Sequence, residues 1–368
     1  MNLNPSLEIS AKELHDRLQA QEDLALIDVR SPQAYYDWNL LDSKNIPLRE
    51  LFEKRELGAE FKNRKIITVC TRGNDSNMAA KILRSQGISA LSLHGGLKEW
   101  SSILDPVEIP TKEPNLRVTQ FRRIAKGCLS YIISHEDEAV VIDPVYDIQP
   151  YMDHIDNEGL TVTHVLDTHC HADHVSGARE LSSKMDAELR LSTFDPFDFE
   201  FTPMENNDSI QVGNYSITAM HTPGHTKGST TIRIKHQGIF TGDTVFADGI
   251  GRPDLADKVE EFASDLFHTL TTTIAKLPAN EFIAAAHHGK FAMNHFHKPI
   301  ITTIEDFTQD PVHKTEKDTF VTRAVDSIKK IQKPPSYRTI VQINCGRLFL
   351  APDQIQELEI GPNRCAMG

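Results

Sequence analysis

The 368-residue sequence has little that would place the chain in a membrane. No apolar segment approaches the length of a membrane span. The first residues, from Met1 to Pro5, show no basic region followed by an apolar run, so no signal peptide is expected. A cytoplasmic location is therefore the default expectation, and no membrane partner is expected.

Basic charge and paired cysteines are also scarce. A formal net charge of -13 leaves no basic stripe to neutralise phosphates, so nucleic acid is not an expected partner. No cysteines form a CxxC or paired framework, which argues against a disulfide scaffold. With 39% hydrophobic and 25% charged residues, the sequence is typical of a soluble globular protein, and its length favours two domains. The five cysteines are Cys70, Cys128, Cys170, Cys345 and Cys365.

The first hundred residues have the pattern of a small α/β domain. Apolar segments at 24–30 and 65–70 are expected to be buried strands of a parallel sheet that is covered on both faces. Ligand chemistry in such sheets lies at the carboxyl ends of the strands, where Cys70 stands. We place this domain at 1–105 and a linker with three prolines at 106–117.

Cys70 opens a tight loop that runs into a segment of helical periodicity at 77–83. Loop amides and the helix dipole would stabilise a thiolate or persulfide anion there, so a reactive thiol is expected. The alternative is a structural cysteine at a strand end. The candidate persulfide loop consists of Thr71, Arg72, Gly73, Asn74, Asp75 and Ser76.

Together with Asp28-Val29-Arg30 and the segment 93–100, this loop resembles that of a rhodanese domain. The resemblance implies that Cys70 is the catalytic residue and carries sulfur as a persulfide. Many thiosulfate-using rhodaneses have a cation where this chain has Asp75. A carboxylate there should repel a dianionic donor and favour a persulfide.

A second candidate site begins directly after the apolar segment 162–166. Histidine and aspartate alternate over a few residues, and two imidazoles separated by one residue can face one metal ion. The following Asp-His pair can face a second position beside it. The candidates in this stretch are His169, His171, Asp173 and His174.

Further candidate ligands follow apolar strands downstream. His221 follows the strand 215–220, Asp243 follows another strand, and His287 ends a third. We expect these side chains to converge with His169. His225, His288, His295 and His297 are expected to be loop or surface histidines, Cys128 to lie in the core, and Cys170 to face away and pack.

From about Val118 to His288 the set resembles the metallo-β-lactamase fold superfamily, which implies an αββα sandwich with a metal site at one edge. We assign 118–310 to this domain. Two glutathione-using branches compete: persulfide dioxygenases with one Fe(II), and hydroxyacylglutathione hydrolases with two metal ions, here two Zn. For the first branch the resemblance implies iron bound by His169, His221 and Asp243. His171, Asp173, His174 and His287 would orient the ligands or bind a second metal.

Three features favour the dioxygenase branch. The segment 248–255 is similar to a Gly-x-Gly-Arg-x-Asp motif, and its Arg252 would suit an anionic sulfur or a glutathione carboxylate. The C-terminal part resembles the tail of those dioxygenases, which gives Cys365 a possible substrate-binding role, with an unimportant terminal thiol as the alternative. The fused rhodanese handles the same sulfur. The expected partners are glutathione persulfide or a related persulfide, O2, and sulfite or thiosulfate.

Residues 311–368 are too few to bury a core of their own, so we expect this extension to pack on the metal domain or across a subunit interface. A helix is predicted at 322–331 and a strand at 339–343. We also expect a homo-oligomer. A non-enzymatic sulfur-responsive module is a third alternative to the two enzymes.

Overall fold

The computed structural model describes residues 7–40, 42–53, 57, 61, 64–253, 258–288, 298–328, 336–361 and 366–367. Its contacts divide the chain into two compact units. The first is built mainly from residues up to Ile103 and the second mainly from residues after it, although Arg123–Lys126 belongs with the first. Among the described helices, none combines the length and the apolar character needed to cross a bilayer.

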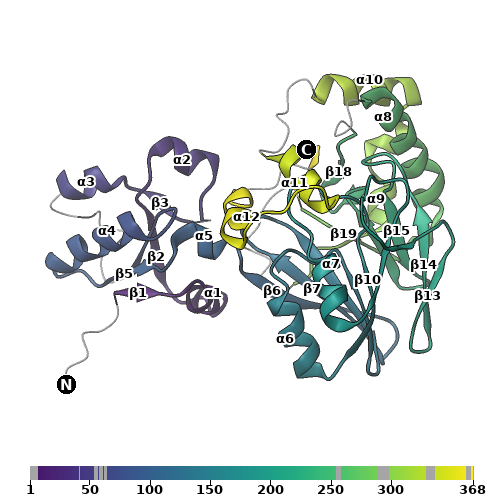
Figure 1. Ribbon diagram of the computed structural model, residues 1–368. Coiled ribbons are helices and arrows are strands. Elements are labelled where there is room, and N and C mark those ends of the chain that lie inside the picture. Colours follow the sequence, from purple (N-terminus) through teal and green to yellow (C-terminus); the bar gives the residue numbers. More distant parts are fainter. Residues whose placement is uncertain are drawn as a thin grey trace. The chain divides into compact units, whose positions relative to one another are not determined.

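The first unit contains a five-stranded parallel sheet in the order β1-β5-β4-β2-β3 (Figure 1). Its strands are β1 (Glu8–Ile9), β2 (Leu24–Asp28), β3 (Lys44–Asn45), β4 (Lys65–Val69) and β5 (Ala90–Leu93). Its helices are α1 (Ala11–Gln19), α2 (Pro32–Asp37), α3 (Leu48–Glu53), α4 (Asn74–Ser85) and α5 (Gly96–Trp100).

Alternate residues of β2 enter different cores on the two faces of this sheet, because successive side chains of a strand point in opposite directions. Leu24 and Leu26 pack with Leu14 of α1 and Trp100 of α5. Ala25 and Ile27 pack in the second core, with residues of α3 and α4. The predicted parallel α/β domain with both faces covered is therefore confirmed.

The second unit has two large sheets and one small one. The seven-stranded sheet has the order β12-β11-β10-β9-β8-β7-β6, formed by β6 (Leu104–Ile109), β7 (Leu116–Arg123), β8 (Leu129–His135), β9 (Glu138–Ile142), β10 (Thr161–Leu166), β11 (Glu188–Leu191) and β12 (Thr202–Pro203). The six-stranded sheet follows the order β13 (Ser209–Val212), β14 (Tyr215–His221), β15 (Thr230–Ile234), β16 (Gly238–Gly242), β19 (Phe282–Ala285) and β20 (Thr302–Thr303). The small sheet consists of β17 (Val245–Phe246), β18 (Gly249–Gly251) and β21 (Ala366–Met367).

The main core lies between the two large sheets. Tyr131 and Ile133 of β8 pack there with Ile217 of β14 and Phe240 of β16, and Tyr131 and Phe240 meet edge to face. The outer face of the seven-stranded sheet is covered by α6 (Gln149–Glu158) and α7 (Ala178–Met185). The predicted αββα sandwich is confirmed, since helices also cover the other sheet.

Helices on the outer face of the six-stranded sheet pack on Ile239 and Ile283. They are α8 (Val259–His268), which continues as a π-helical turn (Thr269–Thr273) and a 3-10 turn (Ile274–Lys276), then α9 (Ile304–Thr308), a further 3-10 turn (Pro311–Lys314) and α10 (Lys317–Ile328). The chain ends with α11 (Tyr337–Asn344) and α12 (Pro352–Leu358) before β21.

Two secondary-structure predictions need correction. Residues 106–109 of the expected linker lie in β6, an edge strand of the seven-stranded sheet. Edge strands tolerate proline, so proline content did not distinguish strand from linker. The expected strand 339–343 is the helix α11, in which Ile340 and Asn344, four residues apart, are buried on one side. The expected helix 322–331 corresponds to α10, which begins earlier, at Lys317.

Candidate metal centre and persulfide loop

Loops at the ends of four strands bring candidate metal ligands together. His169, His171, Asp173 and His174 lie between β10 and α7, and His225 lies between β14 and β15. Asp243 directly follows β16, and His287 lies two residues after the end of β19. All of these side chains are buried. The loop after β10, residues 167–176, is called the ligand loop below.

The first group of donors consists of His169, His225 and Asp243. Asp243 Oδ2 lies 3.8 Å from His169 Nε2 and 3.5 Å from His225 Nε2. Within the described part of the chain, none of these three buried atoms has a hydrogen-bond partner. Buried polar atoms normally have partners, so three of them facing one point fit a bound metal ion.

Hydrogen bonds on the other ring nitrogens orient both imidazoles. His225 Nδ1 lies 2.9 Å from the carbonyl oxygen of Arg252, so Nδ1 carries the proton and the Nε2 lone pair is left for a metal. His169 Nδ1 lies 3.0 Å from Thr168 Oγ1, which in turn donates to Asp143. Gly251 allows the close approach beside Arg252, because a Cβ there would lie 1.7 Å from the Asp243 carbonyl oxygen.

The prediction of His221 as a ligand is wrong in this geometry. His221 is the last residue of β14 and pairs with Thr230, so its side chain follows the pleat of the sheet. Its ring stacks on Phe194, and Nε2 lies 2.7 Å from the carbonyl oxygen of Lys227. His225, expected to be a loop or surface residue, lies with His169 and Asp243 instead. The intervening Thr-Pro-Gly turn was the signal that the chain leaves the strand between the two histidines.

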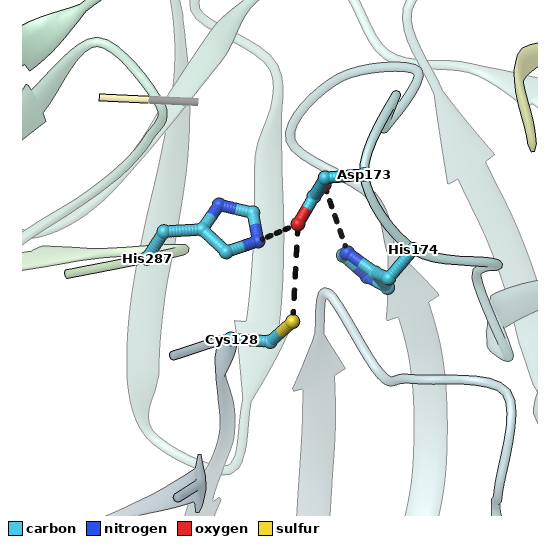
Figure 2. Close-up of side chains that lie close together, drawn as sticks. All are labelled: Cys128, Asp173, His174 and His287. Atoms are coloured by element: carbon cyan, nitrogen blue, oxygen red, sulfur yellow. Dashed lines mark hydrogen bonds and ion pairs between the residues drawn. The ribbon is translucent and has the colours of Figure 1, made fainter. Parts of the chain in front are cut away.

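The second group consists of Cys128, Asp173, His174 and His287, whose side chains converge in Figure 2. Asp173 is its centre: Oδ2 lies 2.7 Å from His287 Nε2 and 3.9 Å from Cys128 Sγ, and Oδ1 lies 3.2 Å from His174 Nδ1. Three of the four were predicted as possible ligands of a second metal. Cys128, which was assigned to the core, is buried as expected, but it also adds a thiol to this group.

His287 connects the two groups, because its Nδ1 lies 2.6 Å from Asp243 Oδ1. Burial alone would lower the pKa of His287, but Asp173 and Asp243 raise it well above the ordinary value. Burial likewise opposes a charged His174, yet Cys128 and Asp173 raise its pKa to about 10. Burial lowers the pKa values of His169 and His225. The first group is therefore ready for a metal at neutral pH, whereas the second group holds protons.

His171 lies next to both groups, with its ring centroid 4.2 Å from that of His169 and 4.3 Å from that of His174, but its Nε2 belongs to a third group, with Asp143 and Asp167. Its Nε2 lies 3.1 Å from Asp143 Oδ1 and 3.9 Å from Asp167 Oδ1. Asp143 also accepts hydrogen bonds from the backbone N–H and the hydroxyl of Thr168, directly before His169. Through these contacts Asp143, which the sequence reasoning did not select, supports the start of the ligand loop.

The C-terminal extension contacts the same loop. The Asn344 amide of α11 donates to the carbonyl oxygens of His171 and His174, each at 2.9 Å, and accepts from the backbone N–H of Ser176. Glu359 accepts from the backbone N–H of Val175 at 2.6 Å. Cys345 Sγ lies 3.6 Å from Cys170 Sγ, so Cys170 packs against the extension.

In the first unit, Cys70 follows β4 and is buried. Its Sγ accepts from the backbone N–H groups of Gly73 at 3.1 Å and Ser76 at 3.4 Å, and lies 3.3 Å from Ser76 Oγ. Gly73, with φ of 90°, turns the loop into α4. These donors around sulfur can stabilise a thiolate or a terminal sulfur anion.

The other loop and substrate predictions have mixed outcomes. Asn74 and Asp75 lie in the first turn of α4 and are exposed, as is Arg72, whereas Thr71 is half-buried. Arg252 is fully buried, and its backbone carbonyl oxygen contacts His225 Nδ1. Cys365, His295 and His297 lie outside the described residues. His288 is buried rather than exposed, at 7%.

Comparison with known proteins identifies both domains. The family model of the Rhodanese-like domain matches residues 10–103, and that of the Metallo-beta-lactamase superfamily matches residues 123–289. The mitochondrial persulfide dioxygenase ETHE1 of Bos taurus is 31% identical over 187 residues, covering 49% of this chain and 69% of the bovine protein. The chain belongs to the persulfide dioxygenase family. In this family member a rhodanese-like domain precedes the metallo-β-lactamase domain.

Hydrolases of the same superfamily are also similar to this family member. A hydroxyacylglutathione hydrolase of Prochlorococcus marinus is 27% identical over 174 residues, covering 45% of this chain and 66% of the hydrolase. Among solved structures, a metallo-beta-lactamase of Staphylococcus aureus is 28% identical with a TM-score of 0.58, covering 64% of this chain and 74% of that one. Sequence similarity therefore extends to both branches, and the donor atoms must distinguish between them.

Proposed function

We propose that the second unit oxidises a low-molecular-weight persulfide, glutathione persulfide in the first instance, with O2. The observation that carries this proposal is the first donor group, two imidazoles and one carboxylate whose three donor atoms lack other partners. Two histidines and one carboxylate are the set that holds ferrous iron in non-haem oxygenases and leaves open positions. One Fe(II), when bound there, would supply the dioxygen chemistry.

The reaction balances with one water: glutathione persulfide, O2 and H2O give sulfite, glutathione and two protons. Asp243 is suited to its role because, although burial favours the neutral acid, the ion pair with His287 lowers its pKa and keeps it ionised. His287, between Asp173 and Asp243, is placed to hold a proton beside the reacting centre. His174 is a second proton-holding imidazole, and Asp173 pairs with both His174 and His287.

The first unit is proposed to transfer sulfur through a persulfide on Cys70, supported by the donors of the loop around its Sγ. Transfer between this thiol and sulfite, thiosulfate or a low-molecular-weight persulfide would process the same sulfur as the second unit. A cytoplasmic location and a homo-oligomer stay predictions from the sequence.

A second candidate function is a binuclear thioester hydrolase with an accessory rhodanese. It is supported by the four donors of the second group, Cys128, Asp173, His174 and His287, which could hold a second ion such as Zn²⁺. Against it, His287 forms ion pairs with both Asp173 and Asp243, which a second metal would have to displace.

Anaerobic purification followed by metal analysis and two assays separates these functions. One iron per chain, with O2 uptake from glutathione persulfide, is the result expected for the dioxygenase. Two zinc ions per chain, with hydrolysis of a glutathione thioester and no O2 uptake, would establish the hydrolase instead. A chain that binds no metal and shows neither activity would leave the sulfur-responsive module.

A further inference from the structure

We propose that Asp195 is a positioning residue that sets the spacing of His169 and His225 by joining the two loops that carry them. Asp195 lies on neither loop, but on the segment between β11 and β12. It is 8% exposed. This inference rests on the proposed metal assignment, since it concerns how two of the three ligands are held.

One carboxylate oxygen of Asp195 reaches both loops. Oδ2 accepts the backbone N–H of Cys170, the residue after His169, at 2.7 Å. The same oxygen accepts the hydroxyl of Thr226, the residue after His225, at 3.3 Å. The distance between the loops at this point is therefore fixed through a single buried atom, one residue away from each ligand.

The second oxygen strengthens the contact with the His225 loop. Asp195 Oδ1 accepts the backbone N–H of Gly228 at 3.1 Å. A Cβ at Gly228 would lie 2.3 Å from the Asp195 carboxylate carbon, so glycine is what allows the carboxylate to approach this closely. All three partners are donors, which requires a side chain with two acceptor oxygens. An amide in the same place would turn one acceptor into a donor facing an N–H or O–H group.

Both loops retain a backbone connection without Asp195, because Thr230 N–H donates to the Thr168 carbonyl oxygen at 2.8 Å. Replacement of the side chain should therefore alter the ligand geometry without separating the loops. Removal of a side chain that orients a metal ligand commonly weakens metal binding by about 10- to 100-fold. The same range is expected for Asp195.

The test is Co²⁺ titration of the metal-free full chain, followed by the visible absorption of the bound ion, which reports ligand geometry as well as affinity. We expect Asp195→Asn to weaken Co²⁺ binding within that range and to change the band shape. Asp198→Asn is the matched control, because Asp198 lies three residues away with a side chain that is 71% exposed. Gly228→Ala should reproduce the Asp195→Asn effect, and the double variant should be no weaker than the stronger single variant.

An unchanged affinity and spectrum in Asp195→Asn, or additive effects in the double variant, would overturn this role. If thermal unfolding shows that Asp195→Asn does not fold, the positioning role of Asp195 is tested with Gly228→Ala instead. A parent-like Co²⁺ spectrum in Gly228→Ala would then overturn that role. The metal assignment itself is tested separately with His225→Ala. If His225→Ala binds Co²⁺ as the parent does, the proposed function fails whatever Asp195 does.

Discussion

His225 Nε2 and Asp243 Oδ2 face each other at 3.5 Å, whereas His221, four residues earlier, has its ring against Phe194. His225→Ala should therefore lose most of its iron and its O2 uptake with glutathione persulfide, because one of three protein ligands is removed. The loss of iron affinity should exceed the roughly 10- to 100-fold loss that is typical when a residue hydrogen-bonded to a metal ligand is replaced. His221→Ala, the matched control, should keep the iron of the parent. The reverse result in a metal analysis of both variants would restore His221 as the ligand.

The two donor groups should respond differently to pH. Burial has lowered the pKa values of His169 and His225, so they are neutral at ordinary pH and metal binding to their group should change little between about pH 6 and 8. The pKa values of His287 and His174 are raised, so a second ion must displace their protons and should bind more tightly as pH rises. Each displaced proton gives roughly a tenfold change in affinity per pH unit. Zn²⁺ titrations at several pH values measure this, and a pH-independent second equivalent would contradict it.

The amide of Asn344 should contribute measurably to the stability of the ligand loop. Asn344→Ala removes partners from the carbonyl oxygens of His171 and His174 and from the N–H of Ser176. Leaving a buried donor without a partner costs about 1–3 kcal/mol, so the second unit should unfold at a lower temperature, by roughly 2–10 °C. Calorimetry of the full chain checks this, with the exposed amide of Gln342→Ala, two residues earlier, as control. Equal unfolding temperatures for the two variants would show that solvent replaces the lost contacts.

Cys70→Ser should separate the two activities. O2 uptake from ready-made glutathione persulfide is expected to be unchanged, because the proposed metal ligands all belong to the second unit. Sulfur transfer should be lost. If the thiol acts after oxidation, by passing persulfide sulfur to sulfite, the variant should accumulate sulfite where the parent makes thiosulfate. Identical sulfite to thiosulfate ratios in the two proteins would exclude that coupling.

Reversing the charge of Asp75 tests which sulfur donor the Cys70 loop prefers. Asp75 is exposed in the first turn of α4, so solvent screens its effect on a dianionic donor. Asp75→Arg should raise thiosulfate:cyanide sulfurtransferase activity, by roughly two- to fivefold, which corresponds to a surface charge effect. Asp16→Arg on α1 is the control for total charge. Equal rates in both variants would show that Asp75 does not influence the donor.

Both folds could be predicted because their signals are local. Apolar runs bounded by turn residues marked the buried strands, and histidines one residue apart marked the ligand loop before any contact was known. Alternation along β2 explains why a single apolar run serves two cores. Such features depend only on the period of a strand or the position of a loop.

The remaining site residues were missed because their roles depend on contacts between distant segments. Cys128 joins Asp173 only after β8 and β10 pair through β9, and nothing near Cys128 in the sequence distinguishes it from a core thiol. Choosing between His221 and His225 required knowing where β14 ends. Asn344 lay in a short apolar segment with no clear period, so its buried face in α11 was not visible in the sequence.

The contact of Val175 with Glu359 joins residues 184 positions apart, and Asn344 reaches the same loop from a similarly late point in the chain. During synthesis at about 5–20 residues per second, the ligand loop would leave the ribosome roughly 10–40 seconds before its last partner is made. The sheet of the first unit needs no such wait, because its last strand in the chain, β5, ends at Leu93. Metal loading is therefore expected late in biosynthesis, after the loop around Cys70 has formed.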